Sequence, residues 1–168
     1  VTGDGMAIEE LLSQGKNLDG SSVRVTGVRV AFVDTYDETN SGRVGNVFLT
    51  DLNSSPKAFQ GLLAYNPGFA PPSYRPVAGD VVDVSAAFQL YHLSFVDEIY
   101  VTPELVTGTL SLRFDSPKAT LKPIVAVAPL ADDASDEEKL NTFEGIPDLI
   151  DYDRGKPWIS MLVTLKNV

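Results

Sequence analysis

The chain carries few residues that could perform covalent chemistry. Its 168 residues include a single histidine, His92, and no cysteine. A histidine-centred triad needs a nucleophile and an orienting carboxylate beside the imidazole, and the sequence around His92 suggests no such set. The lack of cysteine removes disulfides, thiolate metal sites and cysteine nucleophiles together. We therefore expect the protein not to be an enzyme.

Two acidic segments have the composition of a hard-cation site. The first contains Asp34, Asp37, Glu38 and Asn40, and the second contains Asp148, Asp151 and Asp153. Calcium prefers carboxylate and carbonyl oxygens supplied by flexible loops. Neither segment has the spacing of an EF-hand loop, and Asp-rich turns are more often simply solvated. We expect no cofactor, with calcium at these loops as the alternative.

Aromatic residues on strands could bind a ligand by stacking. Tyrosine rings on the face of a small barrel can stack against bases or sugars, whereas large residues such as Phe48 and Phe88 are expected to fill the barrel core. The predicted ligand-binding residues are Tyr36, Tyr65, Tyr91, His92 and Arg24.

The charge of the chain restricts the partners. The chain has 13 Lys and Arg residues and 23 Asp and Glu residues, for a formal net charge of −10. Such a surface repels polyphosphate and anionic lipid. Nucleic acid is therefore disfavoured as a partner, and a glycan or another protein suits the charge better.

The hydrophobic pattern predicts strands rather than long helices. A short helix is expected at Met6–Leu12, with Asp4 as N-cap and Gly15 as the stop. Period-two alternation and turn residues predict the other elements. The predicted strands cover residues 23–33, 44–51, 61–65, 81–90, 93–101, 105–113 and 159–168. Residues 66–76 are a proline-rich connector, residues 131–140 are a loop or short helix, and residues 146–157 are a second loop.

Gly27 marks the most informative point of this pattern. The apolar residues alternate as Val23 and Val25, then change phase at Gly27 and resume at Val28. A glycine at a phase change indicates a bulge, and a small closed barrel needs a long strand that bends in this way. We predict an all-β, closed barrel with a short N-terminal helix and an irregular C-terminal extension that ends in a strand.

An ordered set of short motifs resembles a known domain family. The set comprises Asp19-Gly20 followed by the first strand, Asn46–Asp51, Gly61–Tyr65 and Val77–Val84. Together they resemble the oligonucleotide/oligosaccharide-binding (OB) domains of secreted bacterial nucleases and large cell-surface lipoproteins, over about Ile8 to Thr107. The resemblance implies an OB-like barrel, and in those nucleases the chemistry belongs to separate domains.

The C-terminal part departs from this pattern. Phe143-Glu144-Gly145 and Met161–Val168 are similar to the segment that opens the next domain in tandem arrays, but Ile146–Ile159 separates the two parts. We divide the chain into a barrel at 1–113 and an extension at 114–168. The terminal strand, with Ile159, Met161, Val163 and Leu165, could close the barrel, pair with a neighbouring molecule or begin a second repeat.

These observations predict a non-catalytic binding or assembly module. It would act through protein or glycan contacts, with strand addition and homo-oligomers through edge strands as one route. The chain begins at Val1 without an initiator Met or a basic and apolar leader, which indicates either a processed exported protein or an excised fragment. We expect the first, a protein that is extracellular or in the cell envelope. No apolar run has membrane-spanning length. The alternatives are an accessory nucleic-acid-binding domain of a secreted nuclease and a calcium-stabilised adhesion domain.

Overall fold

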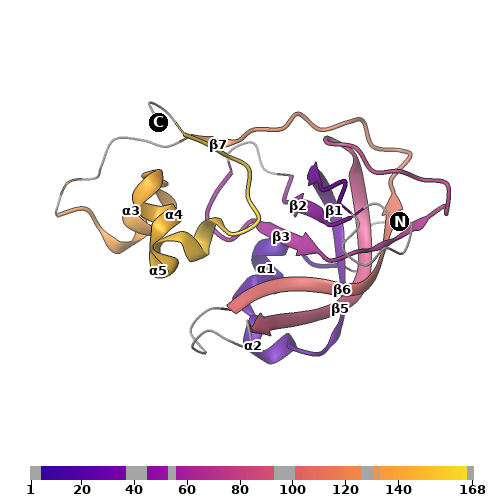
Figure 1. The fold of residues 1–168 in the computed structure, drawn as a ribbon, viewed down its shortest axis with the longest axis horizontal. Helices are drawn as coiled ribbons and strands as arrows, with labels where there is room; N and C mark the ends of the chain where they lie inside the picture. The colour runs from indigo at the N-terminus through magenta and orange to yellow at the C-terminus, as the bar shows by residue number, and fades with distance from the viewer. Residues whose placement is uncertain are drawn as a thin grey trace.

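The computed structural model describes residues 5–36, 45–52, 56–92, 101–125, 131 and 133–165. Its main element is an antiparallel sheet that closes into a five-stranded barrel when β3 pairs in parallel with β6 (Figure 1). The predicted all-β barrel is therefore confirmed. The strands of the main sheet are β1 (Ser22–Val33), β2 (Val47–Thr50), β3 (Gly61–Ala64), β4 (Gly68–Ala70), β5 (Val81–His92) and β6 (Val101–Leu112).

Gly27 is the corner of the first strand, as the phase change predicted. It has a φ of +65°, which favours glycine, and the register of β1 against β5 shifts between Val25 and Val28. The carboxylate of Asp83 accepts a hydrogen bond of 2.8 Å from the Gly27 N–H. One strand can therefore pair with β5 before and after the bend while it keeps apolar residues in the interior.

The strand connectivity is compatible with an OB-like fold. Around the barrel the order is β1, β2, β3, β6 and β5, and β5 pairs again with β1. One edge of β6 pairs first with β3, at Glu104 and Leu105, and then with the short strand β4. The interior is filled by aliphatic residues from every barrel strand and by Phe88.

The N-terminal helix covers one end of this core. It is divided into α1 (Ile8–Ser13) and α2 (Gly15–Leu18), so Gly15 begins a second turn and does not end the helix as predicted. Residue 4 lies outside the described residues, and the N-cap is Ala7. Ala7 has no side-chain acceptor for the first N–H groups of the helix. The Asp51 carboxylate, at the end of β2, accepts hydrogen bonds from the N–H groups of Ile8 and Glu9 instead.

Prolines concealed strand β4 and the start of β6 from the sequence pattern, while the strand predicted at 105–113 corresponds to the rest of β6. Strand β4 lies inside the proline-rich connector, at the edge of the sheet, where pairing on one side suffices. Strand β6 runs through Pro103 without a break, because its pairing with β3 begins only at Glu104. The strand predicted at 93–101 falls outside the described residues, apart from Val101.

The extension is more helical than the sequence indicated. The loop predicted at 146–157 is wrong, because short helices form there after Gly145 and are started by Pro147 and by the Asp151 cap. The helix predicted as one option at 131–140 does form, with a capping box between Ser135 and Glu138. The elements are β7 (Ile124–Val125), α3 (Asp136–Asn141), α4 (Ile146–Ile150), α5 (Tyr152–Gly155), the 3-10 helix η1 (Lys156–Trp158) and β8 (Val163–Thr164).

The extension lies beside the barrel (Figure 1). It has its own small hydrophobic core. Phe143 and Trp158 pack edge to face at its centre, with ring centroids 5.6 Å apart. Ala58, from the loop between β2 and β3, belongs to the same cluster, so the barrel part of the chain contributes a residue to this core.

The predicted terminal strand is shorter than expected. Among its described residues only Val163 and Thr164 form a strand, which pairs in parallel with β7, while Ile159 and Ser160 lie in a turn. Met161, Val163 and Leu165 still alternate toward the second core, which explains the sequence pattern. None of the helices in the described ranges has the length and apolarity needed to span a bilayer.

Candidate functional site

The hairpin of β5 and β6 presents different residues on its two faces. Because side chains alternate along a strand, Gln89 and Tyr91 lie on one face of β5, and Thr102 and Glu104 lie on the same face of β6. The alternate positions, among them Phe88, face the other way. The first face forms the floor of a groove.

This groove has a volume of about 700 Å³ and draws its walls from four strands and their ends. Such a size lies within the range of small-molecule sites. Its lining combines two tyrosines with amide, hydroxyl and carboxylate groups and two aliphatic residues. The lining residues are Asn46, Leu63, Tyr65, Asn66, Gln89, Tyr91, Thr102, Glu104, Val106 and Thr107.

Glu104 is the buried polar group of the groove. It is only 6% exposed, and its carboxylate accepts a hydrogen bond from the side-chain amide of Gln89. Burial raises the pKa of Glu104 above its ordinary value, because desolvation disfavours the charged form, and the Gln89 hydrogen bond opposes this only in part. An acceptor and a donor are thus held side by side at the groove floor.

Two tyrosines from different strands reach the same groove. Tyr65 follows β3, where its N–H donates to the carbonyl of Leu105 over 2.8 Å, and its side chain is partly buried. Tyr91 lies near the end of β5 and is 46% exposed. An aromatic ring with a polar tip suits a ligand that has both an apolar face and hydroxyl groups.

The backbone at the groove is held in an unusual conformation. Asn66 and Thr107 both have positive φ values, +40° and +52°, and both line the groove. The side chain of Asn46, itself part of the lining, accepts the Asn66 N–H at 3.1 Å. Strained backbone of this kind is concentrated at functional sites.

The structure brings together two of the five predicted ligand residues. Tyr65 and Tyr91 share the groove, whereas Tyr36 is 70% exposed, and neither it nor His92 belongs to the lining. Arg24 lies on β1 and approaches Asp83 at 3.8 Å. Gln89 and Glu104 were not predicted, because their alternation with core residues becomes recognisable only when β6 continues through Pro103.

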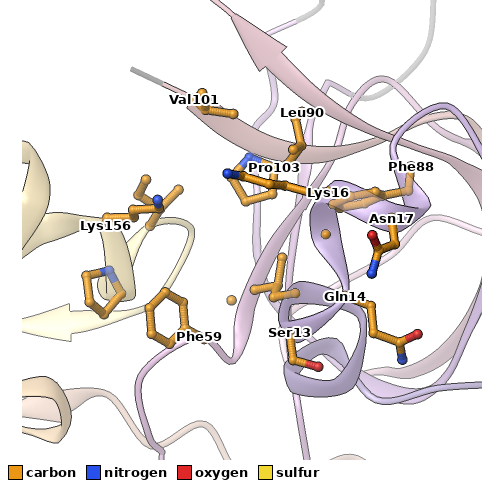
Figure 2. A pocket seen from close by; sticks show the side chains of 15 residues that line it. Ser13, Gln14, Lys16, Asn17, Phe59, Phe88, Leu90, Val101, Pro103 and Lys156 are labelled. Atoms are coloured by element: carbon orange, nitrogen blue, oxygen red, sulfur yellow. The ribbon is translucent and has the colours of Figure 1, made fainter. Parts of the chain in front are cut away.

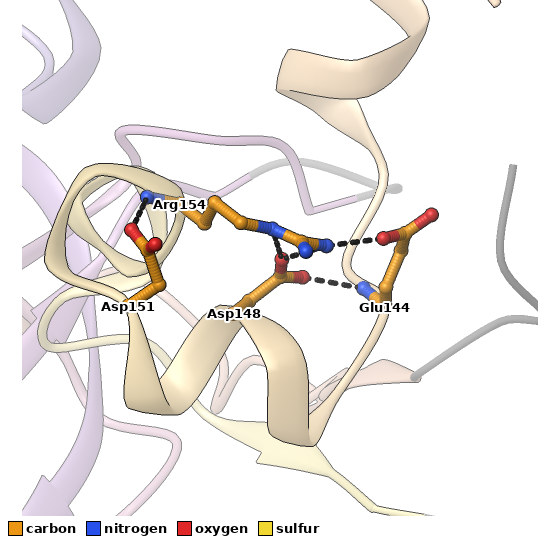
Figure 3. A network of polar contacts seen from close by, with 4 residues as sticks. All are labelled: Glu144, Asp148, Asp151 and Arg154. Carbon is orange, nitrogen blue, oxygen red and sulfur yellow. Dashed lines mark hydrogen bonds and ion pairs between the residues drawn. The ribbon is translucent and has the colours of Figure 1, made fainter. Parts of the chain in front are cut away.

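The acidic residues of the extension bind protein groups (Figure 3). Asp148 is 4% exposed, pairs with Arg154 at 2.9 Å and accepts the Glu144 N–H. Asp151 caps α5 by accepting the Arg154 N–H, and Asp153 lies exposed on that helix. Two of these three predicted metal ligands, Asp148 and Asp153, therefore lie on short helices, and Asp151 is the cap residue between the helices.

The second predicted metal segment is only partly described. The Asp34 carboxylate accepts the Tyr36 N–H at 2.9 Å, and Asp37, Glu38 and Asn40 lie outside the described residues. In the ranges that are described, no three His, Cys, Asp or Glu side chains gather as a metal site would require.

Comparisons of the chain with protein-family models, with curated proteins and with solved structures found no match. The interpretation of the groove therefore depends on its own residues.

Proposed function

We propose that this protein is a non-catalytic binding module that takes a glycan into the groove on the outer face of β5 and β6. The observation that carries this proposal is the combination of Tyr65 and Tyr91 with the buried Gln89–Glu104 pair in one hollow. Binding sites for small ligands typically combine apolar or aromatic walls with a few fixed polar groups.

The chemistry of the lining suits a sugar. A pyranose ring has a face of C–H groups that can lie on an aromatic ring, and hydroxyls around its edge that both donate and accept hydrogen bonds. Tyr65 and Tyr91 supply the aromatic surface. Glu104 accepts, Gln89 both donates and accepts, and Thr102 has a hydroxyl that does both.

Charge supports a neutral or cationic sugar over nucleic acid. Among the described residues that line the groove none is basic, and Glu104 is acidic. A nucleic-acid site would gain its affinity from cations that displace counterions. The alternative role, an accessory domain of a secreted nuclease, therefore has less support at this site.

The number of carboxylates in the groove also favours binding of a sugar over its hydrolysis. Glycoside hydrolysis generally uses a pair of Asp or Glu residues on either side of the scissile bond. Glu104 is the one carboxylate among the described lining residues.

The module would act outside the cell or in the envelope, in line with the resemblance to domains of secreted nucleases and lipoproteins.

The test is a glycan array that includes neutral, amino and acidic sugars, followed by calorimetry with the best neutral or amino oligosaccharide. Tyr91→Ala and Glu104→Ala should each weaken binding by about fivefold or more, since one stacking contact contributes about 1–3 kcal/mol and one hydrogen bond to a carboxylate a similar amount. Tyr36→Ala is the matched control, because Tyr36 is exposed and lies away from the groove.

Two results would contradict the proposal. One is the absence of binding to any neutral or amino sugar. The other is salt-dependent binding of single-stranded DNA that Tyr91→Ala weakens, which would favour the nucleic-acid alternative.

A further inference from the structure

The opposite face of the same hairpin borders a second hollow, of about 510 Å³ (Figure 2). It lies between α1 and α2, the facing ends of β5 and β6, and the segment around η1. The barrel and the extension thus both contribute walls. The lining residues are Leu12, Ser13, Gln14, Gly15, Lys16, Asn17, Phe59, Gly61, Phe88, Leu90, Val101, Pro103, Lys156, Pro157 and Ile159.

The floor and walls of this hollow are mostly apolar. Phe88 is fully buried, and Leu90, Pro103 and Ile159 add aliphatic surface. Phe59 forms part of the wall with a positive φ of +59°, and its N–H donates to the carbonyl of Pro157 over 2.8 Å. This bond ties the barrel loop to the extension and holds an aromatic residue in a conformation that needs support.

Two lysines provide the charge of the hollow. Lys16 comes from α2 and Lys156 from η1, and Figure 2 shows them on opposite sides of the space. Neither forms an ion pair with a described residue, and no carboxylate occurs among the described lining residues. The hollow thus has two cations and an apolar floor on a chain whose net charge is −10.

We propose that this hollow binds a small amphipathic anion, a carboxylate with an unbranched apolar tail. The tail would cover Leu90 and the adjoining aliphatic side chains above the buried Phe88, and the carboxylate would lie between the two ammonium groups. Long lysine side chains commonly place their stems along apolar surface and their charge at its rim. Charge complementarity excludes a cationic amphiphile, and the apolar floor disfavours a simple inorganic anion.

The first experiment compares three ligands with the same twelve-carbon chain, each below its micelle concentration. Dodecanoate is the expected ligand, dodecan-1-ol lacks the charge, and dodecyltrimethylammonium reverses it. Trp158 provides the signal, because it is the single tryptophan of the chain and follows Pro157 of the lining. Dodecanoate should bind at least about tenfold more tightly than the alcohol, and the cation should bind least. Equal binding of all three, or no binding of dodecanoate, would overturn the proposal.

Two kinds of variant test the two parts of the site separately. Gly15→Leu should abolish binding by filling the hollow, since a Cβ at this position would lie 3.8 Å from Phe88 Cζ and 3.9 Å from Leu90 Cδ2 without a clash. The double variant Lys16→Gln/Lys156→Gln should weaken dodecanoate binding about tenfold and leave dodecan-1-ol unchanged. Lys139→Gln, an exposed residue of α3, is the control.

Dodecanoate binding in this hollow does not depend on the glycan groove, which lies on the other face of the hairpin. Failure of both kinds of variant to change dodecanoate binding would overturn this proposal even if a sugar binds as proposed. Circular dichroism of Gly15→Leu checks its fold, and the lysine variants provide the answer if that variant does not fold.

Discussion

Gln89 on β5 and Glu104 on β6 are direct register partners, and the amide of Gln89 donates a hydrogen bond to the carboxylate of Glu104. Their neighbours along each strand, Phe88 and Pro103, face the second hollow. A single two-stranded ribbon therefore separates a polar, tyrosine-lined groove from an apolar, lysine-rimmed one. Period-two alternation is the physical cause, because each strand supplies every second residue to each side.

Burial of Glu104 should make stability depend on pH. Its pKa is raised above the ordinary value of 4.5, so the folded state holds its proton at pH values where the unfolded state has already lost it. The stabilising contribution is complete below the unfolded pKa and is lost as the pH rises through the folded pKa. We expect Glu104→Gln to be more stable than the wild type near neutral pH, with the difference shrinking toward zero at about pH 4.

Urea unfolding of both proteins at about pH 4 and about pH 7.5 measures this difference. Gln can still accept the hydrogen bond from Gln89, so the substitution changes the charge with little change in shape. A stability difference that stays the same at both pH values would contradict a desolvated carboxylate at this position.

The barrel could be predicted from the sequence because it depends on local signals. The phase change at Gly27 and the alternation on either side of it come directly from the geometry of one bent strand. The groove was recovered only in part. Tyr65 and Tyr91 were identified as aromatic residues on strands, but their distance in the groove is set by the parallel pairing of β3 with β6, which no short pattern encodes.

The extension was predicted less well for a different reason. Helices α4 and α5 have five and four residues, too few for a helical period to emerge from the sequence. Their acidic residues were therefore interpreted as a solvated or metal-binding loop. Asp148 is instead buried and bound to Arg154, a contact that depends on how two short helices pack.

Gly27 should tolerate no side chain. Its φ of +65° is costly for any residue with a Cβ, and a Cβ there would lie 3.2 Å from the Arg113 guanidinium. Gly27→Val is expected to destabilise the fold by about 2 kcal/mol or more, which a urea unfolding midpoint measures. Gly68→Ala is the control, because the nearest atom to its added Cβ is 3.6 Å away and its φ is not positive. Equal effects of the two substitutions would show that Gly27 is not a strained corner.

Asp51 should contribute to stability as a cap supplied from the barrel. Its buried carboxylate accepts the N–H of Ile8 at 2.8 Å and that of Glu9 at 3.0 Å, and thereby joins α1 to the end of β2. Asp51→Ala should cost about 2 kcal/mol in urea unfolding, because two N–H groups at the start of a packed helix lose their acceptor. Asp51→Asn keeps one acceptor oxygen and should cost less. An Asp51→Asn variant as unstable as Asp51→Ala would contradict the capping role.

The Asp148–Arg154 pair should hold the extension together. Arg154 donates from Nε to Asp148 over 3.0 Å, and the carboxylate of Asp148 is almost fully buried. Arg154→Met should destabilise the extension by about 2 kcal/mol, less than for a fully buried pair, because the Arg154 side chain is 45% exposed. Trp158 lies in the second core, so its fluorescence follows this unfolding specifically.

The double variant Asp148→Asn/Arg154→Met and a calcium titration together test whether Asp148 serves as an ion-pair partner or as a calcium ligand. Removing both charges leaves no charged carboxylate at position 148, so the double variant should recover part of the stability that Arg154→Met loses, although the ion pair of Arg154 with Glu144 stays lost. If Asp148 were instead a calcium ligand, added calcium would raise the melting temperature of the wild type but not of Asp148→Asn, through linkage. We expect calcium to leave the difference between these two proteins unchanged, because Arg154 and the Glu144 N–H already bind both oxygens of Asp148.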